Sequence, residues 1–241
     1  MLKAVFFDID DTLFSTTEFA ALARRAAIEA LRTHGVRMSA EELLREFQEV
    51  VAEFSSNYPN HIDKLLLRLP REATAGVNPA VLVAAAVAAY HDAKGPHLRP
   101  FPDVLPALRR LAASPLFRGI ITSGLPVKQA EKLLRLGVYP LLTPAAIFIS
   151  DQIGISKPNP KLFLRACADC GLEPSECAYV GDHPANDIDP ANEIGMVTVL
   201  ARRNTRHSNE PARTAPRHIV ADFTELLTLL SGEYRVNVPP A

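Results

Sequence analysis

Short apolar runs recur along most of the chain, and each one ends close to polar or small residues. Residues 3–7 form the first such run, with one Val and two Phe, and Asp8 follows it directly. A run this short is typical of a strand that is buried on both faces. Similar runs occur at residues 119–122, 146–149, 177–180 and 196–200, and a shorter one at 218–220 predicts a last edge strand.

Helical patterns separate most of these runs. The spacing of apolar residues predicts helices at 102–113, 126–136, from Pro160 to just before Gly171, and 223–230. Proline at the start and glycine just past the end support two of these assignments. Strands that alternate with helices predict an α/β fold, in which a parallel sheet carries helices on both faces. Ligands of such sheets lie beyond the carboxyl ends of the strands.

Residues 15–95 show a different pattern, because no convincing strand occurs there. A capping box at Ser15–Glu18 predicts a helix that Gly35 ends, and another at Ser39–Glu42 predicts a second helix. Asn78 and Pro79 predict a third helix, which ends at Gly95. We therefore expect an all-helical insert at 15–95, a return linker at 95–100, and a core made of residues 1–14 and 96–241.

The charge balance argues against recruitment of nucleic acid or of an anionic membrane. Acidic and basic residues nearly cancel, with a formal net charge of -1. Five arginines lie between 202 and 217, but no aromatic residue interleaves them, so a solvated surface loop is expected. The first apolar run is too short for a signal peptide or a membrane span.

All three cysteines lie between residues 167 and 177. An odd number gives no disulfide framework, and a reducing cytoplasm is the expected compartment. Cys167 and Cys170 form a CxxC pair on a predicted helix, but the sequence supplies no obvious further zinc ligands. Small buried side chains are the preferred interpretation.

Two acidic clusters follow predicted strands. Asp8 and Asp10 come directly after the first strand, and Asp182 and Asp187 follow the strand that ends near Val180. Charge at the end of an apolar strand is costly to desolvate, so a function is expected. If the strands are parallel, both clusters face one crevice. Carboxylates packed together need a cation, and oxygen ligands of this kind suit Mg²⁺.

Two smaller elements complete the candidate site. Thr122 and Ser123 end another predicted strand, and their hydroxyls and backbone N–H groups suit phosphate oxygens. Lys157 precedes Pro158, which keeps it out of helical geometry and lets its side chain point into the crevice. Each element alone is also typical of an ordinary turn or surface residue, so the function is inferred from their combination.

In their order and spacing these segments resemble the four motifs of the haloacid dehalogenase (HAD)-like hydrolase superfamily. The first is Asp8-x-Asp10-x-Thr12, and Thr122 and Lys157 match the second and third. The fourth is Gly181-Asp182-x-x-x-Asn186-Asp187. The resemblance spans residues 2 to about 200. It implies a Rossmann-like core, and the helical insert resembles the cap of the C1 class.

The resemblance also implies a role for each matching residue. Asp8 would be the nucleophile, and Asp10 the general acid and base. Thr122 and Lys157 would bind the phosphoryl group, together with Ser123, which stands where relatives often have Asn. Mg²⁺ would be held by Asp8, the backbone carbonyl of Asp10 and Asp182. Asp187 would support the metal or orient Lys157.

These roles predict a Mg²⁺-dependent phosphatase that hydrolyses a small phosphorylated metabolite through an aspartyl-phosphate. Asp10 argues against dehalogenation, because dehalogenases of this family lack the second aspartate. A phosphomutase or phosphotransferase, or a non-catalytic binding module on the same scaffold, remain alternatives. Glyceraldehyde 3-phosphate is one candidate among the metabolites that capped relatives hydrolyse.

The roles of a few polar residues near the expected crevice stay undecided. His183 either touches substrate or a metal-bound water, or is a polar loop residue. In the insert, Tyr58, His61, Lys64 and Arg68 can face a substrate, although a solvated helix surface is the preferred interpretation.

Overall fold

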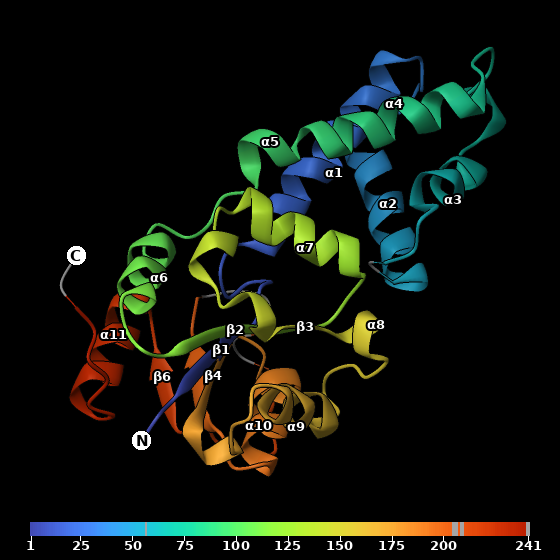
Figure 1. Cartoon of the computed structure of the whole chain (residues 1–241). Helices are drawn as coiled ribbons and strands as arrows, with labels where there is room; N and C mark the ends of the chain where they lie inside the picture. Colours follow the sequence, from blue (N-terminus) through green and yellow to red (C-terminus); the bar gives the residue numbers. More distant parts are fainter. Residues whose placement is uncertain (56, 204–206, 208–209, 240–241) are drawn as a thin grey trace. The chain divides into compact units, whose positions relative to one another are not determined.

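The computed structural model describes residues 1–55, 57–203, 207 and 210–239. The chain divides into two compact units, drawn in Figure 1: a core unit of Met1–Thr17 with Arg99–Ala241, and a helical unit of Glu18–Leu98. In the described part of the chain, no helix is both long enough and apolar enough to cross a membrane.

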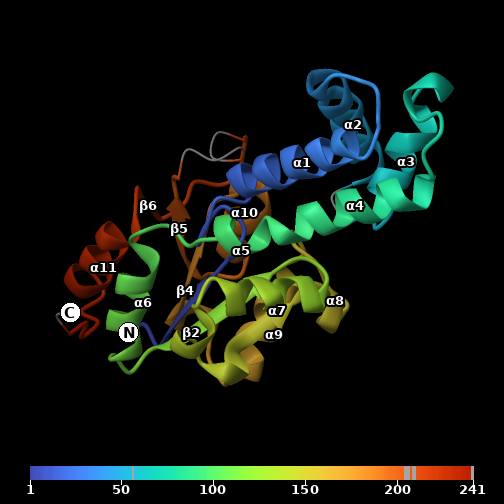
Figure 2. The same ribbon diagram turned by 90° about the horizontal axis from the view of Figure 1, so that it is seen from above.

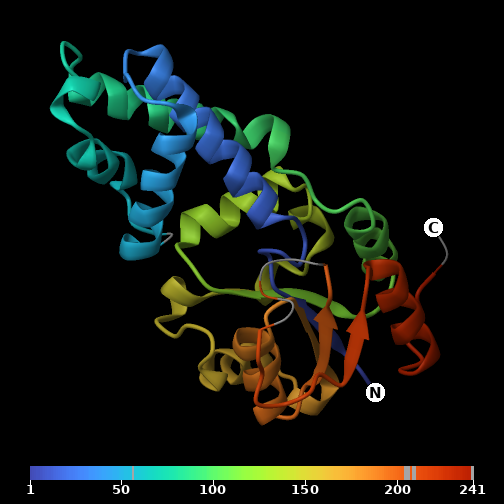
Figure 3. The same ribbon diagram turned by 180° about the vertical axis from the view of Figure 1, so that it is seen from behind.

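The core unit contains a six-stranded sheet in the order β3-β2-β1-β4-β5-β6. Every neighbouring pair of strands runs parallel, which confirms the predicted α/β fold. Each strand lies on one of the apolar runs, and Figure 3 shows β6 at one edge of the sheet. The strands are β1 (Ala4–Phe7), β2 (Phe117–Thr122), β3 (Ile147–Ile149), β4 (Cys177–Gly181), β5 (Val197–Ala201) and β6 (His218–Val220).

Helices cover both faces of this sheet, with α6 and α11 on one side and α9 and α10 on the other (Figure 2). The four predicted core helices are present, whereas α8 and α10 are too short to have shown a periodic pattern. The helices of the core unit are α6 (Val104–Ala112), α7 (Pro126–Arg135), α8 (Ser150–Ile153), α9 (Pro160–Asp169), α10 (Asp189–Glu193) and α11 (Phe223–Gly232). Short helical turns occur at Tyr139–Leu141, Pro144–Ala146, Pro174–Glu176 and, as the π-helical turn η5, at Pro184–Ile188.

Two adjacent phenylalanines of β1 anchor the two layers. Successive side chains of a strand point to opposite faces. Phe6 belongs to the core cluster that includes Leu162 and Phe163 of α9, and Phe7 packs on Phe223 of α11 with ring centroids 5.4 Å apart. The continuous apolar run is therefore required, because both faces of β1 are buried.

The helical unit contains α1 (Thr16–Thr33, whose first two residues belong to the core unit), α2 (Ala40–Phe54), α3 (His61–Arg68), α4 (Pro79–Asp92) and α5 (Lys94–His97). The Ser39 capping box and the Asn78 N-cap are both present. One boundary was predicted wrongly: Gly95 does not end a helix but lies inside α5. The reason is that His97 and Leu98 donate to the carbonyls of Ala93 and Lys94, so helical bonding continues past Gly95.

The three cysteines are free, and Cys167 and Cys177 are buried in the core cluster under α9. Cys170 is half-buried and packs against the same cluster. The preferred interpretation of the CxxC pair as small buried residues agrees with this placement.

The arginine-rich segment is not uniformly a solvated loop. Arg203 makes two bonds to Asp103, at 3.0 and 2.7 Å, and its guanidinium lies over the rings of Phe101 and Phe223. The Arg203 side chain is only 6% exposed, so the expectation of a surface residue is wrong there. Arg213 is 73% exposed as expected, and Arg206 lies outside the described residues.

Leu162 and Leu164 of α9 provide a matched test of this packing. Leu162 is fully buried, whereas Leu164 is 44% exposed. We expect Leu162→Ala to lower the free energy of unfolding by about 3 kcal/mol, because it leaves a cavity under α9, and Leu164→Ala to lower it by less than about 1 kcal/mol. Urea denaturation followed by circular dichroism measures both values. Equal losses would show that α9 does not pack on the sheet through Leu162.

Candidate active site

Neighbouring strands of the sheet deliver the predicted site residues to one edge. Asp8 follows β1, and its backbone N–H donates to the Val180 carbonyl of β4 at 2.9 Å. Asp182 follows β4, and Thr122 is the last residue of β2. Since β2 and β4 flank β1 in a parallel sheet, the carboxyl ends of all three strands meet.

The ammonium of Lys157 bridges two aspartates in the middle of this edge. Its Nζ lies 2.8 Å from Asp8 Oδ1 and 2.7 Å from Asp187 Oδ1, and it donates to the Tyr179 hydroxyl at 3.2 Å. The side chains of Lys157, Asp8 and Asp187 are all nearly inaccessible to solvent. Burial by itself lowers the pKa of Lys157, but the charges of Asp187 and Asp8 outweigh it and raise that pKa above its usual value. Lys157 therefore stays charged.

Asp8 lies at the centre of the charge cluster. Burial raises the pKa of Asp8 to about 6, Lys157 acts in the opposite direction, and the charges of Asp187 and Asp10 add to the rise. Without a cation, the Asp8 carboxylate is therefore less acidic than an ordinary aspartate.

Three buried carboxylates, those of Asp8, Asp182 and Asp187, place ligand oxygens within 4.8 Å of one another. Lys157 supplies one positive charge against their three negative charges, which leaves an excess of two. An all-oxygen donor set with this excess fits a single hard divalent cation such as Mg²⁺.

Asp187 is fixed from several sides. It accepts hydrogen bonds from Lys157, from the Tyr179 hydroxyl at 3.0 Å and from the His183 backbone N–H at 3.0 Å. Gly181 makes room for it, because a Cβ at that position would lie 2.4 Å from Asp187 Oδ2. Asp187 therefore lies where it can hold the Lys157 ammonium in place.

Asp10 has a separate set of partners. Lys132 Nζ lies 2.6 and 2.7 Å from its two carboxylate oxygens, Thr16 donates at 2.6 Å and Gln129 at 3.3 Å. Burial alone would raise the pKa of Asp10, but Lys132 and the hydrogen bonds lower it below the usual value. Asp10 is thus held ionised in this arrangement.

Gln129 connects Asp10 with the second motif. Its Nε2 lies 3.2 Å from Thr122 Oγ1, 3.3 Å from Asp10 Oδ2 and 2.6 Å from the Ser123 carbonyl. Ser123 Oγ accepts from the backbone N–H of Lys157 at 3.2 Å, so its hydroxyl links the second motif to the third. The structure thus brings together all seven predicted site residues, in two linked groups.

Four further residues of the site were not predicted from the sequence: Lys132, Gln129, Thr16 and Tyr179. Gln129 and Lys132 are three residues apart on α7, which begins just after Thr122, and this spacing was an available signal. Tyr179 carries the only hydroxyl group of β4, whose other side chains are apolar or small, and this was also an available signal. Within the helical unit, Arg68 pairs with Glu53 and Lys64 lies over the ring of Phe54, and both side chains are partly exposed.

Comparison with known proteins agrees with the fold and the motifs. The family model described as haloacid dehalogenase-like hydrolase matches residues 2–195. A glyceraldehyde 3-phosphate phosphatase from Methanopyrus kandleri is 48% identical over 214 residues, which is 88% of either chain. One from Pyrococcus abyssi is 42% identical and covers 83% of this chain and 81% of its own.

A solved HAD phosphatase from Thermococcus onnurineus has the same fold, with a TM-score of 0.69 and 24% sequence identity. The alignment covers 96% of this chain and 99% of that one. The family model spans most of the chain and contains all four motifs. This chain belongs to the haloacid dehalogenase-like hydrolase family.

Proposed function

We propose that the chain is a Mg²⁺-dependent phosphatase that hydrolyses a small phosphorylated metabolite, with Asp8 as its nucleophile. The observation that carries the proposal is the buried ammonium of Lys157 shared by Asp8 and Asp187, next to Asp182. A phosphoryl group entering this edge would meet a carboxylate nucleophile and a fixed positive charge, which phosphoryl transfer requires.

The residues divide the reaction between two carboxylates. Asp8 attacks phosphorus and carries the aspartyl-phosphate. Once it has gained a proton, Asp10 donates it to the leaving oxygen, and the resulting carboxylate then takes a proton from the attacking water. Thr122, Ser123 and Lys157 bind phosphoryl oxygens, and Asp187 keeps Lys157 in position.

The proposed ligands of Mg²⁺ are the carboxylates of Asp8 and Asp182 and the backbone carbonyl of Asp10. Asp187 would support the bound metal. Bound there, the cation would neutralise charge that builds up on the phosphoryl oxygens. The excess of two negative charges in the cluster supports this assignment.

Glyceraldehyde 3-phosphate is the proposed substrate, because several curated relatives named for that phosphatase activity are 36–48% identical to this chain. The helical insert is the proposed cap, on the ground of its position in the sequence directly after the first motif. Three free cysteines support a reducing compartment such as the cytoplasm. Phosphotransfer to a sugar is the second candidate, since mutases can use the same pair of aspartates.

Phosphate release from a panel of metabolites tests the proposal. With Mg²⁺ present, we expect the highest kcat/KM for glyceraldehyde 3-phosphate, compared with phosphoglycolate, phosphoserine, hexose phosphates and nucleotides. Chelation of divalent cations should abolish turnover, and added Mg²⁺ should restore it. A phosphoryl group that moves to another position of a sugar without release of phosphate would instead favour the phosphotransferase.

The nucleophile can be tested with Asp8→Asn. The amide cannot form an acyl-phosphate by attack on phosphorus, so kcat should fall by at least about 10³-fold. The fold should persist, because Lys157 keeps Asp187 as its partner. Asp169→Asn, at the exposed end of α9, is the matched control and should retain its rate. An Asp8→Asn variant that keeps most of its activity would refute the assignment.

Lys132 is a positioning residue whose loss should change the pH profile. Because Lys132 lowers the pKa of Asp10, Lys132→Met should raise that pKa, so Asp10 stays protonated to higher pH. The alkaline limb of kcat/KM should therefore move to higher pH.

Lys132→Arg should keep the wild-type limb, because it preserves the positive charge beside Asp10. Lys128→Met, an exposed lysine on the same helix, is the matched control and should leave the profile unchanged. An unshifted alkaline limb in Lys132→Met would show that Asp10 is not the group that limits the rate there.

A further inference from the structure

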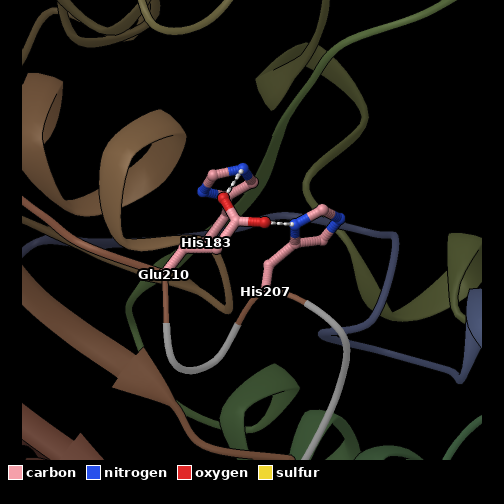
Figure 4. A group of neighbouring side chains, drawn as sticks. All are labelled: His183, His207 and Glu210. Carbon is pink, nitrogen blue, oxygen red and sulfur yellow. Dashed lines mark hydrogen bonds and ion pairs between the residues drawn. The ribbon is translucent and has the colours of Figure 1, made fainter.

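A cluster of two imidazoles and a carboxylate lies next to the fourth motif, and neither the family motifs nor the proposed reaction uses it. It consists of His183, His207 and Glu210, whose ligand atoms all lie within 4.8 Å of one another. Figure 4 shows the Glu210 carboxylate directed toward both imidazole rings. His183 is half-buried on the turn after β4, and the other two residues follow β5, the neighbouring strand.

The two rings are arranged so that each presents one nitrogen to the same carboxylate. They stack with centroids 4.5 Å apart and an angle of 11° between planes. His207 Nδ1 lies 2.6 Å from Glu210 Oε1, and His183 Nε2 lies 3.3 Å from Glu210 Oε2. A turn bond from the Glu210 N–H to the His207 carbonyl, 3.0 Å long, keeps these two residues together.

We propose that His183, His207 and Glu210 form a second metal site, which takes a borderline divalent cation such as Zn²⁺. Two imidazole nitrogens and one carboxylate oxygen are a common zinc donor set, and a water can fill the fourth position. The all-oxygen aspartate centre prefers the harder Mg²⁺, so the two neighbouring sites differ in the cation they select.

The three side chains have to rearrange to close this site around an ion. Zinc bonds of about 2.0–2.1 Å in tetrahedral geometry bring ligand atoms to roughly 3.3 Å from one another. The wider spacings, of at most 4.8 Å, therefore have to contract, and the contact of 2.6 Å between His207 Nδ1 and Glu210 Oε1 has to lengthen as the ion replaces that hydrogen bond. If His183 binds the ion through Nε2, its ring proton lies on Nδ1. Nδ1 then no longer accepts the hydrogen bond of 3.4 Å from the Asn186 N–H. That bond is long, so its loss costs little.

The bound ion would connect two segments that are far apart in the sequence. His183 comes directly after Asp182, and its backbone N–H donates to Asp187, so one end of the link lies at the fourth motif. The other end is the segment after β5. Zinc binding should therefore stabilise the folded protein at the carboxyl ends of β4 and β5.

Co²⁺ is a direct probe, because its visible absorption is strong in four-coordinate sites and weak in octahedral oxygen sites. The titration is done on the Asp182→Asn variant with millimolar Mg²⁺ present, so that Co²⁺ bound at the aspartate centre does not contribute to the spectrum. We expect one equivalent of Co²⁺ to give the strong spectrum and Zn²⁺ to displace it. Zn²⁺ should also raise the Tm of the wild-type protein.

His207→Ala and Glu210→Gln should each weaken Co²⁺ binding at least about tenfold and abolish the rise in Tm. His34→Ala, which removes an exposed histidine between α1 and α2, is the matched control and should bind Co²⁺ as the wild type does. Circular dichroism confirms that each variant folds, and Mg²⁺-dependent phosphatase activity of His207→Ala should stay near wild type. The proposal fails if Asp182→Asn binds no Co²⁺, or if binding is equal in His207→Ala and His34→Ala. Either result would mean that the three side chains form only a hydrogen-bonded cluster.

Discussion

The buried ammonium of Lys157 is the interaction on which the proposed chemistry depends. Asp8 and Asp187 are almost fully buried, and two carboxylates at such a depth repel each other strongly. Lys157 lies between them at hydrogen-bond distance from both. One buried cation thus makes it possible for the sheet to present several acids at one edge, and it leaves a charge excess that a divalent ion can neutralise.

A second ion pair keeps the two working carboxylates electrically distinct. Asp10 is paired with Lys132, whereas Asp8 shares Lys157 with Asp187. The environments move the two pKa values in opposite directions, up for Asp8 and down for Asp10. Gln129, which donates to both Asp10 and Thr122, ties this second pair to the phosphate-binding end of β2.

The strands and the residues at their ends could be predicted because a buried parallel strand leaves an unambiguous apolar run. All six apolar runs form strands. Asp8 and Asp182 directly follow β1 and β4, and Thr122 is the last residue of β2. Lys132 and Gln129 were not predicted, since polar residues on an amphipathic helix look alike whether they face solvent or a site. Arg203 was misjudged for a related reason, because its partner Asp103 is a hundred residues away and no local pattern indicates the pair. In the insert, α2 and α4 were found by their caps. The short helices α3 and α5, whose N-caps make no side-chain bond, were not predicted as separate helices.

The turn after β4 explains how one short segment can serve two different centres. Asp182 and Asp187 are five residues apart, a spacing that an α-helix with 3.6 residues per turn would direct to different sides. The turn η5 is instead π-helical, and the N–H of Asp189 donates to the carbonyl of Pro184 five residues before it. Such wide turns are rare and occur often at functional sites. Here the wider turn returns Asp187 beneath Gly181, where only a residue without Cβ leaves space, so both aspartates reach the same cluster. The ring of the intervening His183 is directed toward Glu210. A regular helix at this position would direct the two aspartates to different sides, so their carboxylates would not share one cluster.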